Sequence, residues 1–134
     1  MKKILFLIIA LSYLISCKKN NQNELNLKFN YISSGASEKL KRQNNTELEL
    51  INTEKNNNRI TISIDRYVTG GIPYYGNARI INDTLYLEYW TDIDENQIPS
   101  LILPSKFKYE VNDTEYKTIA FKYLGNKFLE KKNK

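Results

Sequence analysis

Hydrophobic and polar residues alternate along much of the chain. In segment 25–31, leucine, phenylalanine and tyrosine occupy every second position, and asparagine and lysine separate them. Successive side chains of a β-strand point to opposite faces, so this pattern predicts a strand with one buried face. Further apolar segments, rich in β-branched and aromatic residues, predict strands at 48–50, 60–64, 78–81, 84–90, 107–111 and 119–123.

Asparagine and aspartate mark the turns between these segments. A run of asparagines lies in 54–58, and the pairs Asn82-Asp83 and Asn112-Asp113 each separate two predicted strands. Both residue types tolerate the positive φ angles of tight turns, so a hairpin is predicted at each place. Two longer connections are also predicted, a polar segment at 34–45 with one helical turn around 38–42, and a loop at 69–77.

The predicted strands define the fold class. About seven short strands with turns between them, and no convincing amphipathic helix, predict an all-β antiparallel sandwich. An immunoglobulin-like sandwich is the leading topology, and a small β-barrel is the alternative. The domain is expected to span 25–128 and to be followed by a basic C-terminal tail at 129–134.

The N-terminal segment has a different pattern. Lys2 and Lys3 precede an uncharged, mostly apolar run at 4–15, which is shorter than the roughly 20 residues that a membrane-spanning helix needs. The run ends at Leu14-Ile15-Ser16-Cys17, which resembles the lipobox of bacterial lipoprotein precursors. The resemblance implies a cleaved signal peptide at 1–16 and a diacylglycerol linked to Cys17 through a thioether.

The lipobox resemblance implies an anchored, exported protein. Several acyl chains on Cys17 would attach it durably to a membrane, and the polar residues 18–24 would form a flexible tether. Lys18 stands where enteric inner-membrane lipoproteins carry aspartate, so the resemblance favours the outer membrane and leaves open which side the domain faces. Removal of 16 of the 134 residues leaves 118, enough for one domain.

The amino-acid composition excludes several kinds of catalytic and metal-binding site. The chain has no histidine, and Cys17 is its only cysteine. Catalytic triads, imidazole or thiolate metal sites and disulfides are therefore excluded. Loss of the two leader lysines lowers the formal charge from +5 to +3, with acidic and basic residues interspersed, which argues against a nucleic-acid partner. We expect no enzyme activity and no cofactor besides the covalent lipid.

Aromatic residues form the main candidate binding site. If Leu85, Leu87 and Tyr89 point to the core, Tyr86 and Trp90 share the opposite face of the strand. With Tyr74 and Tyr75 of the 69–77 loop, they could bind a sugar ring or a protein. The alternative, which we favour, is that Trp90 packs at a sheet edge or inside the sandwich.

An acidic segment is a weaker candidate. Asp92, Asp94 and Asn96 place oxygen ligands at alternate positions, as at the start of an EF-hand calcium loop. The glycine that should follow is Gln97, and Leu103 stands where the closing glutamate should be. An acidic loop without an ion is therefore the favoured interpretation.

These features predict a lipid-anchored, non-catalytic binding or accessory module that holds a protein partner in the cell envelope. One alternative is a module that binds a glycan or small ligand through the aromatic face. Another is an inhibitor or immunity-type lipoprotein, which is a special case of the first prediction.

Overall fold

A computed structural model describes residues 25–43, 45–128 and 130. The predicted signal peptide 1–16, Cys17 and the tether 18–24 lie outside the described residues. Most of the predicted tail 129–134 also lies outside them.

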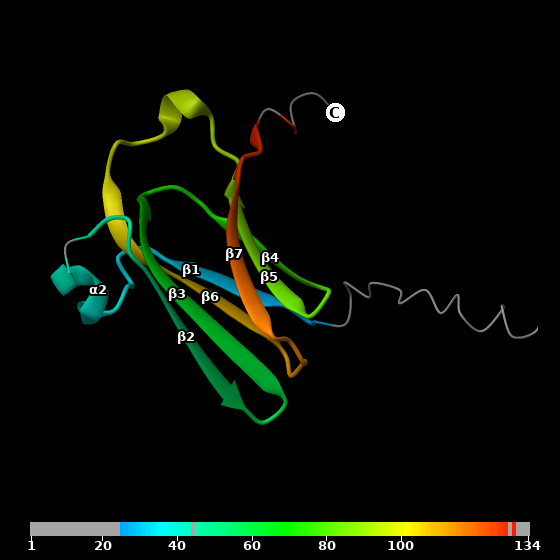
Figure 1. The fold of residues 1–134 in the computed structure, drawn as a ribbon. Helices are drawn as coiled ribbons and strands as arrows, with labels where there is room; N and C mark the ends of the chain where they lie inside the picture. The colour runs from blue at the N-terminus through cyan, green and yellow to red at the C-terminus, as the bar shows by residue number, and fades with distance from the viewer. Residues whose placement is uncertain (1–24, 44, 129, 131–134) are drawn as a thin grey trace, which may run out of the picture.

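Within the described part of the chain, seven strands form two sheets (Figure 1). The first sheet has the order β1 (Lys28–Ile32), β6 (Ile102–Asn112), β3 (Arg59–Thr69) and β2 (Glu49–Asn56). The second has the order β4 (Tyr75–Ile81), β5 (Thr84–Thr91) and β7 (Thr118–Asn126). Two short helices, α2 (Glu38–Gln43) and the 3-10 helix η2 (Glu95–Gln97), lie in the connections. The predicted all-β sandwich is confirmed, and the described strands do not close into a barrel.

The strand order departs from that of an immunoglobulin domain. There the first two strands are neighbours in one sheet, whereas β1 and β2 lie at opposite margins of the four-stranded sheet. Four of the strand pairings are antiparallel, but β5 and β7 run parallel. One pairing thus differs from the predicted antiparallel arrangement.

Two of the three predicted hairpins are confirmed. The turn between β2 and β3 has Asn57 at a φ of 53°, and the turn between β4 and β5 has Asn82 at 47° and Asp83 at 63°. Two consecutive positive φ angles are the signature of a type I′ turn, whose twist matches that of the flanking strands. Asparagine and aspartate therefore adopt the positive φ angles that the sequence pattern predicted for these two turns.

The hairpin predicted at Asn112-Asp113 is wrong. After β6 the chain crosses to the other sheet, where β7 pairs with β5. The physical reason is that β6 pairs with β1 along one edge and with β3 along the other, so neither edge can accept β7. Lys117 donates its backbone N–H to the carbonyl oxygen of Asp83 at 2.8 Å, which guides the chain beside β5.

The predicted helical turn near residue 38 is present as α2. Its single buried residue is Leu40. Asp65 of β3 accepts a hydrogen bond from the backbone N–H of Ser37 at 2.8 Å, which fixes the start of the helix against the sheet.

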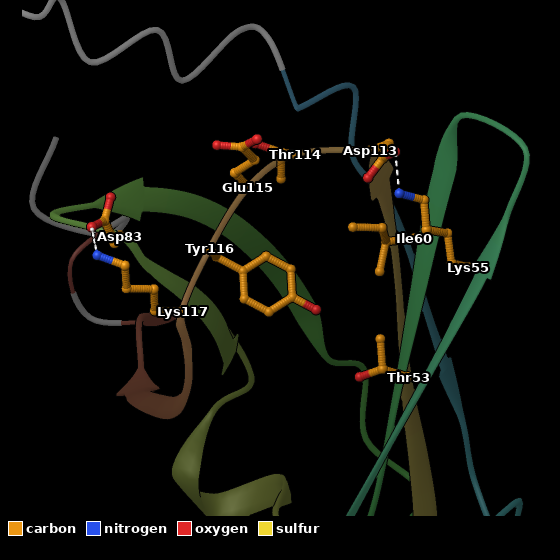
Figure 2. Close-up of a pocket in the computed structure, with 9 residues that line it drawn as sticks. All are labelled: Thr53, Lys55, Ile60, Asp83, Asp113, Thr114, Glu115, Tyr116 and Lys117. Carbon is orange, nitrogen blue, oxygen red and sulfur yellow. Dashed lines mark hydrogen bonds and ion pairs between the residues drawn. The ribbon is translucent and has the colours of Figure 1, made fainter.

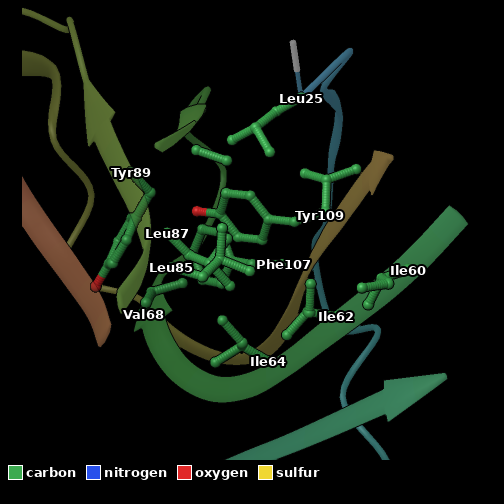
Figure 3. Packing of buried hydrophobic residues seen from close by; sticks show 12 residues of the cluster. Leu25, Ile60, Ile62, Ile64, Val68, Leu85, Leu87, Tyr89, Phe107 and Tyr109 are labelled. Atoms are coloured by element: carbon green, nitrogen blue, oxygen red, sulfur yellow. The ribbon is translucent and has the colours of Figure 1, made fainter. Parts of the chain in front are cut away.

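The core lies between the two sheets (Figure 3). Tyr109 is fully buried in it, and its hydroxyl donates to the carbonyl oxygen of Glu88 at 2.8 Å, so the phenol is satisfied. Burial raises the pKa of Tyr109 well above its usual value. The buried hydrophobic residues that form this core cluster are Leu25, Ile60, Ile62, Ile64, Val68, Ala78, Leu85, Leu87, Tyr89, Phe107, Tyr109 and Val111.

The sandwich has two distinct ends. At the first, which we call the Leu25 end, Asn112 donates its N–H to the carbonyl oxygen of Leu25 at 2.8 Å. The turns of both hairpins and the connection 113–117 also lie there. The opposite end, which we call the far end, carries the loops 70–74 and 92–101, which are joined by the hydrogen bond from Gly70 N–H to the carbonyl oxygen of Leu101.

Candidate functional site

Strand β5 presents one apolar and one mixed face. Leu85 and Leu87 are fully buried, and Tyr89 is 3% exposed. Tyr86 and Trp90 are half-buried on the opposite, outer face. The alternation predicted for this strand is therefore confirmed. The favoured alternative, in which Trp90 packs at a sheet edge or inside the sandwich, is wrong, because β5 is the central strand of its sheet and Trp90 lies on its outer face.

Tyr75 and Trp90 lie directly opposite each other across β4 and β5. Their ring centroids are 6.1 Å apart with an interplanar angle of 22°, which is a stacked arrangement. The Lys127 ammonium lies 4.3 Å from the Trp90 ring centroid, within the range of a cation–π interaction. Because Tyr75 is 41% exposed, this stack forms an aromatic surface at the far end of the three-stranded sheet.

A charged pair separates Tyr86 from that stack. Glu88 Oε1 accepts hydrogen bonds from Arg79 Nε at 3.0 Å and from Arg79 Nη2 at 2.7 Å. Hydrogen bonding to Glu88 is the main cause that raises the pKa of Arg79. The same guanidinium lies 5.0 Å from the Tyr86 ring centroid. Glu88 is only 5% exposed, so its carboxylate is engaged within the protein.

The prediction that Tyr74 shares this surface is wrong. Its ring packs inside, with centroids 4.8 Å from Tyr31 and 5.5 Å from Phe107, and its hydroxyl donates to the carbonyl oxygen of Thr69 at 3.1 Å. Burial raises the pKa of Tyr74 above its usual value. The reason is that β4 begins at Tyr75, so alternation directs these neighbouring tyrosines to opposite faces.

The acidic segment after β5 has a local structural role. Asp94 Oδ1 accepts hydrogen bonds from the backbone N–H and the side-chain amide of Asn96, both at 3.0 Å, and so caps η2. Asp92 is half-buried. Within 25–43, 45–128 and 130 there is no cluster of three or more histidine, cysteine or acidic residues able to hold a metal ion.

A cavity of about 600 Å³ lies at the Leu25 end, between the β2–β3 hairpin and the connection 113–117 (Figure 2). The Tyr116 ring points from this connection into the cavity, toward the side that carries Ile60 and Thr53. Ion pairs link Lys55 with Asp113 and Lys117 with Asp83 at its rim. The sequence pattern does not indicate this cavity, because the cavity lies where the chain crosses between the sheets and the pattern predicts a hairpin there.

Arg79 and Lys127 were also missed as partners of the aromatic residues. A two-residue turn at Asn82-Asp83 sets the register of β4 and β5, and this register places Arg79 opposite Tyr86. The position of Arg79 beside Tyr86 therefore follows from the sequence, once the hairpin is placed at Asn82-Asp83. Lys127 lies near Trp90 only because β7 pairs with β5, and no local pattern in the sequence predicts that pairing.

Comparisons with protein-family models, curated proteins and solved structures found no match for this chain. In the part of the chain that the structure describes, no helix has the length and apolar character needed to cross a bilayer.

Proposed function

We propose that the chain is a lipid-anchored, non-catalytic binding module of a bacterial cell envelope, which presents the far end of its sandwich to a protein partner. The lipobox-like segment Leu14–Cys17 supports the anchor, and localisation to the outer membrane is part of the same proposal. The absence of histidine from the sequence supports a non-catalytic role.

The distribution of exposed apolar side chains carries this proposal. Leu101, the last residue of the loop 92–101 at the far end, is 54% exposed, and the next residue, Ile102, is 53% exposed. Single exposed apolar residues are ordinary, but several in one short segment favour an interaction surface, and Ile98, Leu101 and Ile102 lie within five residues of one another. Among the described residues, the exposed large hydrophobic side chains all lie at the middle of the sandwich or toward its far end: Ile32, Ile51, Tyr75, Ile98, Leu101, Ile102 and Tyr123.

The proposed anchor would also orient the exposed apolar side chains relative to the membrane. A fully extended segment from Cys17 to Leu25 would reach about 28 Å, so the Leu25 end would remain near the membrane. The apolar far end would then point away from the membrane, where a partner can reach it.

The test is a crosslinked pull-down of the tagged chain from intact cells, identified by mass spectrometry. The wild-type chain should enrich a specific envelope protein, and Cys17→Ala should lose it because the domain is no longer held at the membrane. The double variant Leu101→Ser/Ile102→Ser should reduce the yield at least severalfold. A matched control is Lys28→Ser/Asn30→Ser, which changes two exposed residues of β1 and should retain the partner.

Recovery of no envelope protein above a control lipoprotein would contradict the proposal. A captured toxin or lytic enzyme would assign the inhibitor or immunity form of it.

A second candidate function is glycan or small-ligand binding at the stack of Tyr75 on Trp90. The exposed Tyr75 ring favours it, since stacked aromatic rings with one open face suit a sugar ring. Trp90 is the only tryptophan, so its fluorescence reports on this site directly. Iodide should quench its emission, and a bound glycan should protect it. A blue emission that iodide does not quench would exclude this candidate.

A further inference from the structure

The two sheets differ in width, and this leaves one margin of the sandwich incomplete. The first sheet has four strands and the second has three. At one margin β1 packs against β4. At the other, β2 has six exposed residues out of eight, and a cavity of about 600 Å³ separates the β2–β3 hairpin from the connection that leads into β7 (Figure 2).

The inner face of β2 lacks a cover. Ile51 and Thr53 lie opposite Ile64 and Ile62, whose side chains fill the core, so alternation places them on the same inner face. Ile51 is nevertheless 46% exposed. In a complete sandwich, a strand of the second sheet would cover this position.

Strand β7 has a free edge that faces the same opening. Among the described residues β7 pairs only with β5, so its other edge presents backbone N–H and carbonyl groups without a strand partner. Tyr123 of β7 is 45% exposed although its ring packs on Tyr89, with centroids 4.9 Å apart.

Two observations, one set of contacts and one cavity, place β2 and β7 at the same margin of the sandwich. Arg66 pairs with Glu49 of β2 at 3.3 Å, and its guanidinium carbon lies 5.8 Å from the ring centroid of Phe121 in β7. Nearer the Leu25 end, the cavity of about 600 Å³ extends from Thr53 of β2 to Lys117, which immediately precedes β7. This margin of the sandwich is therefore bridged by Arg66 at one place and is open at the cavity nearer the Leu25 end.

We propose that an extended segment of a protein partner binds in this opening as an added strand along β7, making the sandwich four strands on four. Its inward side chains would be apolar and would cover Ile51 and Tyr123. This inference rests on the proposed binding role but not on the lipid anchor.

The charge at the edge indicates the chemistry of the partner. Lys122 is exposed at the centre of β7 and makes no ion pair within the described residues. Antiparallel pairing of two β7 strands about their centres would place Lys122 opposite its own copy, and directly opposed like charges are destabilising. A strand with alternating apolar residues and an acidic residue opposite Lys122 fits the edge better than a second copy of this chain.

The test uses the full chain in detergent micelles and a labelled synthetic peptide of about nine residues. The peptide alternates valine and threonine and has glutamate at its centre. Fluorescence anisotropy measures its affinity, and hydrogen exchange read by mass spectrometry measures protection across 118–126. The peptide should slow exchange of the β7 amides that do not bond to β5 by at least tenfold.

Charge reversal tests the role of Lys122. Lys122→Glu should weaken binding about five- to tenfold, and a peptide with lysine at its centre should restore it. The control Lys28→Glu, on the edge strand β1 at the opposite margin, should leave the affinity unchanged. Equal effects of the two variants, or failure of the reversed peptide to restore binding, would overturn the proposed pairing.

Backbone methylation of the peptide tests strand addition without altering the protein. Only one edge of an added strand faces β7, so N-methylation of alternate residues should abolish binding in one of the two possible sets and spare it in the other. Equal results for both sets would overturn the inference. Protection of the same β7 amides in the free chain, by its own residues or in a dimer, would also overturn it.

The two proposals can fail separately. If the pull-down partner is captured equally by wild type and by Lys122→Glu, and the peptide does not protect β7, the binding role remains and strand addition is excluded. If the peptide binds as described but no envelope protein is captured, strand addition remains and the envelope role fails.

Discussion

Replacement of Gly76 by alanine should destabilise the domain, because a ring from the other sheet occupies the space beside its Cα. A Cβ built at Gly76 would lie closer than 3.0 Å to three carbons of the Phe29 ring. Ordinary carbon–carbon contacts are about 3.5–4.0 Å, so the ring or β4 would have to move by roughly 1 Å. The ring has little freedom, since its centroid lies 5.1 Å from that of the fully buried Tyr109.

The size of the effect follows from two opposing terms. Overpacking of a close-packed core costs about 1–3 kcal/mol. Alanine recovers roughly 0.5–1 kcal/mol through the lower backbone entropy of its unfolded chain, and Gly76 does not have a positive φ that alanine would resist. The free energy of unfolding should therefore fall by about 1–2 kcal/mol, which is roughly 5–10 °C in Tm for a domain of this size.

Urea unfolding followed by Trp90 fluorescence measures this change, and a double-mutant cycle with Phe29→Leu tests its cause. In the Phe29→Leu background, Gly76→Ala should cost less by about 1 kcal/mol. The control is Gly125→Ala, where φ is +87° and no atom lies within 4 Å. Its cost comes from the backbone and should add to that of Phe29→Leu. An additive result for Gly76 and Phe29, or a stabilising Gly76→Ala, would refute the steric argument.

Three further outcomes are expected. Arg79→Ala should lower the urea midpoint, because it leaves the buried Glu88 carboxylate without its hydrogen-bond donor. Adding Glu88→Leu to Arg79→Ala should recover most of the lost stability, and no recovery would contradict this explanation. Asp83→Gly should raise stability by up to about 1 kcal/mol in denaturant titrations, because glycine suits the positive φ of the turn and the exposed pair with Lys117 contributes little; Asp83→Val should lower it. Burial raises the pKa of four phenols above the value near 10 of an unfolded chain, so the stability they contribute is present below about pH 10 and declines as pH rises further. The four are Tyr74, Tyr89, Tyr109 and Tyr123. In tyrosinate absorbance the first three should ionise only on unfolding, and early ionisation of these three would contradict their burial.

Local patterns predicted the facing of β5 and two of the hairpins correctly, but they could not predict which strands are neighbours. The same Asn-Asp-Thr sequence occurs at 82–84 and at 112–114. The first forms a hairpin, whereas the second leads across to the other sheet. The difference arises because both edges of β6 are already paired, with β1 and β3. That condition depends on residues far away in the sequence.

The candidate site was predictable to a similar extent. Alternation placed Tyr86 and Trp90 on one face, but the start of β4 decided which of Tyr74 and Tyr75 joins them. An extension of the Asn82-Asp83 hairpin register through 75–81 would have identified Tyr75 as the partner of Trp90. The stack with Lys127 and the cavity around Tyr116 depend on β7, whose parallel neighbour no local signal indicated.

The position of β6 also governs the order in which the chain can fold. It is the sixth of seven strands along the sequence, yet it occupies the interior of the four-stranded sheet and joins β1 to β3. Until residues 102–112 are available, β1 has no strand to pair with, and the core lacks Phe107 and Tyr109. Pairs such as Tyr31 with Phe107 close a long loop, which slows folding. A chain emerging from its N-terminus would thus complete its four-stranded sheet and its core only after residues 102–112 had appeared.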